Sequence, residues 1–204
     1  MDMNDLPRGP QPGDLGFAVM PGRVGAGVNL GMALLRDSCR FGHVFQVVYP
    51  IGHEIYTDGL IQEAMPGGMR VRPLADRLKP GYAYASIGLT PAQREMVPTI
   101  ARTFMPSLGG VGGDERGPGY SFGTYLALAL AQNPFTRWIT PSLERIIDNR
   151  GRWVCSQHVD EFAIRLGVHL FRDLRWRGDV TPGDVYYATD PRVIKPAPPS
   201  VDGA

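Results

Sequence analysis

The sequence predicts an α+β fold in a single domain. Apolar runs of strand length, punctuated by glycine and proline, fill the first part of the chain, and helical patterns dominate after residue 90. The 204 residues suffice for one domain with a full core. The strand-like runs are not separated by regular helical crossovers, so a parallel α/β sheet is not expected.

The first part reads as strands with one interrupting helix. Aliphatic and aromatic residues bounded by turn residues favour strands. The expected strands cover residues 14–20, 43–49, about 54–65, 69–73 and 82–87. A helix is expected over about 29–36.

The second part turns helical at Thr90, which caps a helix whose first residue is Pro91. Gln93 completes a capping box, and the helix should run to about Phe104. A glycine-rich loop follows. Helices are then expected near 122–131, 141–148 and 155–166, and a last short strand over 184–188.

Both ends read as tails around one domain. Residues 1–12 are polar and rich in proline, and residues 192–204 are a proline-rich stretch unsuited to a helix or a central strand. The domain is therefore expected over 13–191.

Composition excludes several classes of protein. The net charge of +1 gives no broad basic field for nucleic acid, and no apolar run is long enough to span a membrane. The N-terminus does not resemble a signal peptide, so we expect a cytoplasmic protein, or one exported without a signal peptide. No metal-ligand spacing occurs and no cofactor is indicated. A glycine-rich loop, Gly25–Gly31, matches a dinucleotide-binding loop only weakly, because its spacing is wrong and the expected acid is missing.

Cys155 is the first candidate for chemistry, because it stands where a helix is expected to begin. Backbone N–H groups and the helix dipole favour a thiolate there. Residues at helical spacing from Cys155 form one apolar stripe, so the thiol should face inward: Val159, Phe162, Ala163 and Leu166. A small core cysteine is the alternative.

His43 is the candidate base, and Glu63 the candidate acid beside it. If residues 43–49 and 54–65 form a hairpin, paired residue numbers sum to about 106, which sets His43 opposite Glu63. A bulge at Asp58 would shift the register by one residue, so Gln62 is also a candidate. A satisfied structural histidine is the alternative for His43, and a surface carboxylate is the alternative for Glu63.

Among the other histidines, His158 lies three residues after Cys155 and could serve as the base instead. It ranks below His43, because a base on the same helix leaves little room for a substrate. His53 and His169 read as loop and helix-end residues.

A succession of short motifs resembles the circularly permuted papain-like proteins of the NlpC type, specifically the YiiX-like amidases. The resemblance covers about residues 12–190 and keeps the family's order of histidine, acid and cysteine. The motifs are Pro12–Phe17, Phe41–Val44, Leu60–Met69, Leu89–Gln93, Gly119–Phe122, Trp153–Ser156 and Thr181–Val185. Gly42 and Gln157 depart from the family, which usually has serine and glutamate there.

The resemblance implies a permuted papain-like fold, with an antiparallel sheet or barrel packed against helices. It implies Cys155 as nucleophile, His43 as general base and Glu63 as the residue that orients it, with Tyr120 and Gln62 as candidate oxyanion or substrate contacts. The implied activity is a cysteine hydrolase that cleaves an amide bond in a peptide or cell-wall peptide. An acyltransferase on the same fold and a binding or structural module without turnover are the alternatives; the sequence does not determine the oligomeric state.

Overall fold

The computed structural model describes residues 10–20, 39–49, 59–65, 68–104, 154–173, 180–189 and 192–193. Several predictions fall outside these residues. They are the helices near 29–36, 122–131 and 141–148, the Gly25–Gly31 loop and the glycine-rich loop after residue 104.

The core of the fold is one antiparallel sheet with the strand order β4-β3-β2-β1-β5-β6. Its strands are β1 (Leu15–Ala18), β2 (His43–Tyr49), β3 (Leu60–Met65), β4 (Gly68–Pro73), β5 (Ala83–Ala85) and β6 (Arg192–Val193). Among the described residues β4 and β6 are edges and do not pair with each other, so the sheet is open. The α+β class and the antiparallel sheet are confirmed, whereas the barrel is wrong.

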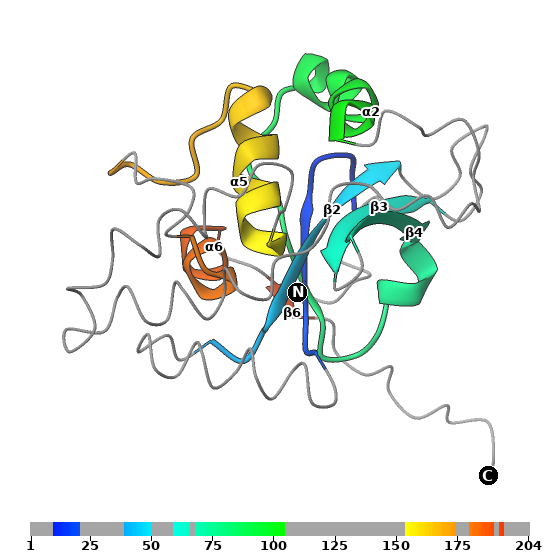
Figure 1. The fold of residues 1–204 in the computed structure, drawn as a ribbon, viewed down its shortest axis with the longest axis vertical. Coiled ribbons are helices and arrows are strands. Elements are labelled where there is room, and N and C mark those ends of the chain that lie inside the picture. The colour runs from blue at the N-terminus through cyan, green and yellow to red at the C-terminus, as the bar shows by residue number, and fades with distance from the viewer. Residues whose placement is uncertain are drawn as a thin grey trace, which may run out of the picture.

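Helices cover one face of this sheet (Figure 1). They are α2 (Pro91–Phe104), α5 (Cys155–Arg165) and α6 (Pro182–Thr189). The helix α5 lies along β2 and β3, with α2 at one end of it and α6 beside it. A short 3₁₀ helix, η2 (Leu74–Arg77), follows β4.

Alternation along β2 explains how the sheet divides the core. Val44 packs with Cys155 and Val159 of α5, whereas Phe45 and Leu74 of η2 belong to a separate cluster. Successive side chains of a strand point to opposite faces, so β2, buried along almost its whole length, is apolar on both. This places β2 between α5 and η2.

The predicted elements within the described residues are mostly confirmed. The strand 43–49 has the predicted bounds, and the helix that begins after Thr90 ends at Phe104. The capping box is present, since Thr90 N donates to Gln93 Oε1 at 2.9 Å and Gln93 N donates to Thr90 Oγ1 at 3.3 Å.

The strand predicted over 184–188 is wrong, because these residues belong to α6. Asp184 N donates to Thr181 Oγ1 at 3.1 Å, and Thr181 N donates to Asp184 Oδ2 at 2.9 Å. This reciprocal cap, with Pro182 at the first helical position, begins a helix despite the strand-like residues that follow. The chain then enters β6, so the sheet reaches two residues past the predicted domain boundary at 191.

The predicted register of the hairpin is also wrong, by two residues. Gln46 pairs with Gln62 and Val47 with Ile61, so paired numbers sum to 108, and the bulge lies in β2 between Val47 and Tyr49. Extended to the start of β2, this register sets His43 opposite residue 65. A shift of two residues keeps every side chain on its face, so Glu63 remains on the face of His43 and becomes its diagonal neighbour.

Candidate active site

The first turn of α5 holds Cys155 at the first helical position, directly after the N-cap residue Val154. Val154 N donates to the Gln157 side chain at 3.3 Å, and Ser156 Oγ donates to Val180 O at 2.6 Å. The first bond closes the turn itself, and the second fixes it against the segment before α6. The predicted apolar stripe is confirmed, because Cys155 and the stripe residues that follow it are buried.

His43 and Glu63 form a buried hydrogen-bonded pair. His43 Nε2 donates to Glu63 Oε2 at 2.8 Å, and neither residue is more than 1% exposed. A carboxylate can only accept, so Nε2 carries the proton. Glu63, and not Gln62, is therefore the acid beside His43.

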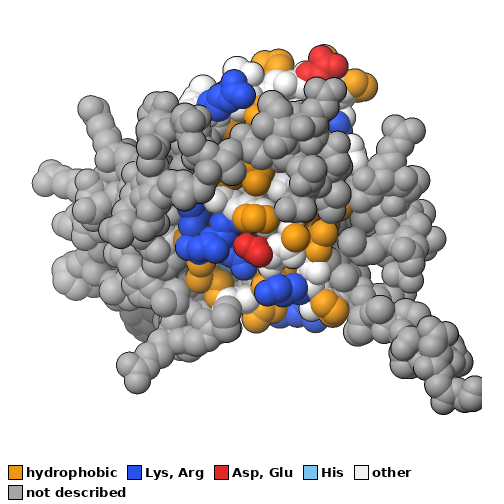
Figure 2. Space-filling model, turned by 90° about the vertical axis from the view of Figure 1, so that its right-hand side faces the viewer, with side chains coloured by type: hydrophobic (Ala, Val, Ile, Leu, Met, Phe, Trp, Pro, Cys, Tyr) orange, Lys and Arg blue, Asp and Glu red, His pale blue; other side chains and the backbone are white. Residues whose placement is uncertain are grey.

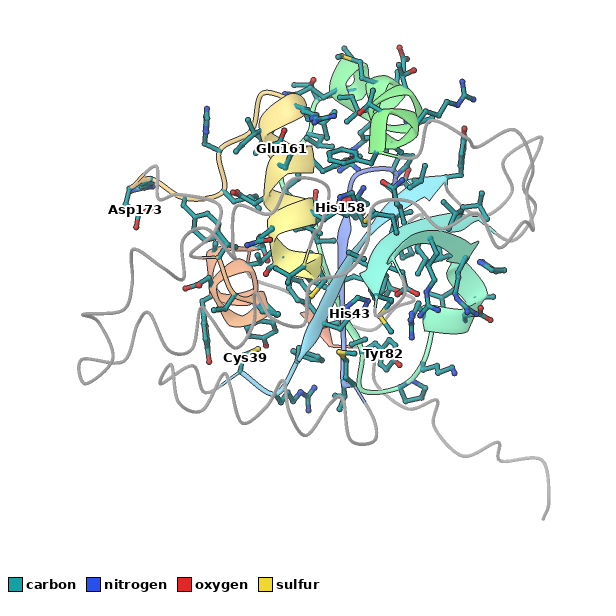
Figure 3. The ribbon with its side chains drawn as sticks, in the orientation of Figure 1. Cys39, His43, Tyr82, His158, Glu161 and Asp173 are labelled. Atoms are coloured by element: carbon teal, nitrogen blue, oxygen red, sulfur yellow. The ribbon has the colours of Figure 1, made fainter. Side chains whose placement is uncertain are left out.

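The thiol of Cys155 interacts with the same imidazole. Nε2 is occupied by Glu63, which leaves Nδ1 to the thiol. Nδ1 has no partner of full hydrogen-bond geometry among the described residues, whereas Cys155 still acts on His43 through hydrogen bonding and charge. In Figure 3, His43 lies beside the end of α5 where the helix begins.

The pKa of His43 reflects its contacts with Glu63 and Cys155. Burial alone would lower it, but the hydrogen bonds and charges of Cys155 and Glu63 outweigh burial and raise the pKa from 6.5 to about 9. The imidazole is therefore favoured in its charged form at neutral pH. Because coupling between two sites is reciprocal, the same interaction favours the thiolate of Cys155.

Three arginines converge on the other side of Glu63. Arg77 Nη2 donates to Oε1 at 2.9 Å and to Oε2 at 2.7 Å, and Arg70 Nε donates to Oε1 at 3.1 Å. Arg72 Nε lies 3.9 Å from Oε1. Figure 2 shows Lys and Arg side chains gathered on the surface of the face that carries β4, and Glu63 itself is buried. Glu63 is thus enclosed by cations while it remains buried.

These cations explain the ionisation of Glu63. Burial would raise its pKa, but the hydrogen bond and charge of His43, followed by those of Arg77, lower it from 4.5 to about 2. The carboxylate is consequently charged at every pH at which the protein is expected to work.

The arginines were not predicted. Arg70 and Arg72 alternate along a strand, which is typical of a solvated edge, and Arg77 lies beyond the strand in η2. Glu63 pairs with Arg70 in the ladder between β3 and β4, which would have indicated a contact between them. This pairing cannot be read from the sequence, because it depends on the register of the two strands.

Gln62 lies on the opposite face of β3 from Glu63. Gln46 Nε2 donates to Gln62 Oε1 at 2.7 Å, and Gln62 Nε2 donates to Ala101 O at 3.0 Å in the last turn of α2. Its amide therefore joins the sheet to the end of a helix. Tyr120, the other candidate substrate contact, lies outside the described residues.

His158 lies away from the His43–Glu63 pair, between α5 and α2. Its ring meets Phe104 edge to face with 4.6 Å between centroids. Burial, and then the charge of Arg165, lowers its pKa from 6.5 to about 3. His158 is therefore a neutral core residue, and His169 is exposed. His53 lies outside the described residues.

A metal ion does not suit the described part of this site. No group of three or more His, Cys, Asp or Glu side chains that could hold a metal occurs among the described residues. The carboxylate of Glu63 is already bonded to His43, Arg70 and Arg77, and the two arginines repel a further cation.

No helix within the described ranges is long and apolar enough to cross a membrane.

No protein-family model and no curated protein sequence matches this chain. Among solved structures, the fold is similar to the crystal structure of the metalloprotein yiiX from Escherichia coli O157:H7, DUF1105. The two share 17% sequence identity with a TM-score of 0.56, over 93% of this chain and 99% of that chain. The similarity shows the fold alone.

Proposed function

We propose that this protein is a cysteine hydrolase that cleaves an amide bond through Cys155, His43 and Glu63. The carrying observation is that buried His43 is hydrogen-bonded to Glu63 at 2.8 Å and has its pKa raised by both Glu63 and Cys155, although the three residues are far apart in the sequence. A thiol at a helix start, an imidazole and a carboxylate fill the three roles of this chemistry.

In the proposed mechanism, His43 holds the proton of Cys155 as an imidazolium. The thiolate attacks the carbonyl carbon, and the backbone N–H of Cys155 at the start of α5 stabilises the oxyanion. His43 then gives its proton to the leaving amine, and an acyl-enzyme remains. Water, deprotonated by His43, releases the acid and restores the thiol.

We extend the proposal to the permuted papain-like fold and to a peptide or cell-wall peptide substrate. The order of histidine, acid and cysteine along the chain supports it. The acyltransferase alternative uses the same acyl-enzyme with an alcohol or amine in place of water. Trapping the acyl-enzyme and identifying the product by mass spectrometry separates the two.

One observation favours the alternative of a module without turnover. Cys155 is 0% exposed and belongs to the same apolar cluster as Val44 and Val159. A nucleophile must meet its substrate, so this burial requires that neighbouring atoms yield before the thiol reacts. A buried core cysteine would stay unreactive while the protein is folded.

Alkylation of the native protein by iodoacetamide, measured by peptide mass spectrometry, decides between a cysteine hydrolase and a module without turnover. Cys39 provides the matched control, because it is also buried and belongs to the same cluster. We expect rapid labelling of Cys155 and slow labelling of Cys39. Cys155→Ser should abolish hydrolysis of amide substrates, whereas Cys39→Ser should keep it. An unlabelled native Cys155, or full activity in Cys155→Ser, ends the proposal.

A further inference from the structure

We propose that Arg77 is a positioning residue for the triad: it holds the carboxylate of Glu63 from the side opposite to His43 and shares Oε2 with the imidazole, so that it limits the negative charge that Glu63 presents to His43. This inference rests on the proposed function. The short helix η2 contains none of the proposed catalytic residues, but through Arg77 it holds the carboxylate of Glu63 in place.

The contacts of Glu63 carry the first step. A carboxylate has about four positions for accepting hydrogen bonds. His43 occupies one at Oε2, while Arg77 Nη2 lies between both oxygens at 2.9 and 2.7 Å. Arg70 occupies another at Oε1. Only one bond is therefore made to His43, and the others fix the rotation of the carboxylate around it.

Arg77 is itself held in place by the fold. Leu74, at the start of η2, is fully buried, and Leu74 N donates to Gly59 O at 3.1 Å. The Tyr84 hydroxyl of β5 donates to Arg77 O at 3.1 Å, and the guanidinium lies over Phe45 at 5.9 Å. Because η2 and Arg77 are anchored to β2, to β5 and to Gly59 just before β3, Arg77 can hold Glu63 in a fixed geometry.

Arg77 and His43 also compete for one oxygen. Both donate to Oε2, at 2.7 and 2.8 Å, so the arginine shares the negative charge that stabilises the imidazolium. The charged groups around Glu63 are His43 from β2, Arg70 and Arg72 from β4, and Arg77 from η2; Cys155 of α5 faces His43. Removing the nearest cation should leave the carboxylate freer to stabilise the protonated imidazole.

The test is the titration of the His43 ring by NMR in protein labelled with ¹⁵N-histidine, with His43 assigned by its loss in His43→Gln. In Arg77→Met, the midpoint should rise by about 1 pH unit, because an adjacent positive charge is lost. Arg77→Lys restores the charge and should return the midpoint toward that of the original protein. Arg72→Met removes a charge from the same face at longer range and should give a smaller rise.

The same samples separate failure of this inference from failure of the proposed function. If Arg77→Met lowers thermal stability while the His43 midpoint stays in place, Arg77 is merely structural and the inference is overturned. If Cys155 resists iodoacetamide in the original protein, the proposed function fails whatever Arg77 does. A rise in the midpoint that Arg77→Lys reverses supports the proposal that Arg77 limits the negative charge that Glu63 presents to His43.

Discussion

At the scale of single residues, the charge balance around Glu63 is the main feature that the sequence did not reveal. Residues 43, 63 and 155 could be singled out from a helix start, a strand start and hairpin arithmetic. The arithmetic was wrong by two residues, but the period of two in a strand kept Glu63 on the correct face. Convergence of three arginines on one carboxylate depends on register and on η2, which local patterns do not determine.

Glu63→Gln tests the acid directly. The amide keeps the shape of the side chain but loses the charge that, with its hydrogen bond, helps to raise the pKa of His43 to about 9. We expect the His43 midpoint in the NMR titration to fall by about 1 pH unit or more. Amide hydrolysis should fall about 10-fold or more, because general acid–base catalysis contributes at least that much.

Glu161→Gln is the matched control, since Glu161 also pairs with an arginine, Arg165, at 3.0 Å. It lies on α5 beyond the first turn and should leave the His43 midpoint unchanged. An equal fall in both variants would contradict a specific role for Glu63.

At the scale of secondary structure, local sequence predicts best where a helix start or a buried strand decides the outcome. The strand β2 and the helices α2 and α5 have the expected positions. The sequence predicts a strand from Asp184 to Ala188, where valine and two tyrosines favour one, but these residues lie in α6. The cap at Thr181 outweighs that preference, because its hydroxyl accepts a hydrogen bond from the N–H of Asp184. The N–H groups in the first turn of a helix have no acceptor within the helix.

Thr181→Ala should therefore destabilise the protein by about 0.5–2 kcal/mol, the usual effect of losing an N-cap side chain. Thr189→Ala, at the other end of α6, is the control. Its hydroxyl donates to Val185 O at 2.8 Å within the helix and caps no N-terminus. Urea unfolding measures both. Equal stability of Thr181→Ala and the original protein would refute the cap.

At the scale of the whole molecule, the buried ionisable groups link the stability of the fold to pH. Folded His158 stays neutral down to a pKa of about 3, whereas the unfolded chain binds a proton on this ring below about 6.5. The unfolded state therefore holds more protons between these values, so stability falls as pH falls. Glu63 adds to this loss below 4.5, where the unfolded carboxyl becomes protonated and the folded one stays charged down to a pKa of about 2.

His158→Leu tests this linkage. Between pH 6 and 4 we expect the free energy of unfolding of the original protein to fall by up to about 1.4 kcal/mol per pH unit through His158. His158→Leu should flatten that slope, whereas His169→Leu, at an exposed position, should keep it. Urea unfolding over this pH range provides the measurement. A slope unchanged in His158→Leu would mean that the buried ring does not control acid stability.

The central claim, that His43 and Glu63 activate Cys155, is tested most directly by the rate of Cys155 alkylation as a function of pH. The account predicts a reactive thiolate well below the ordinary thiol pKa of about 8.5, and a shift of the rate profile toward that value in His43→Gln. A native Cys155 that stays unreactive, or a profile centred near 8.5 with or without His43, would contradict it.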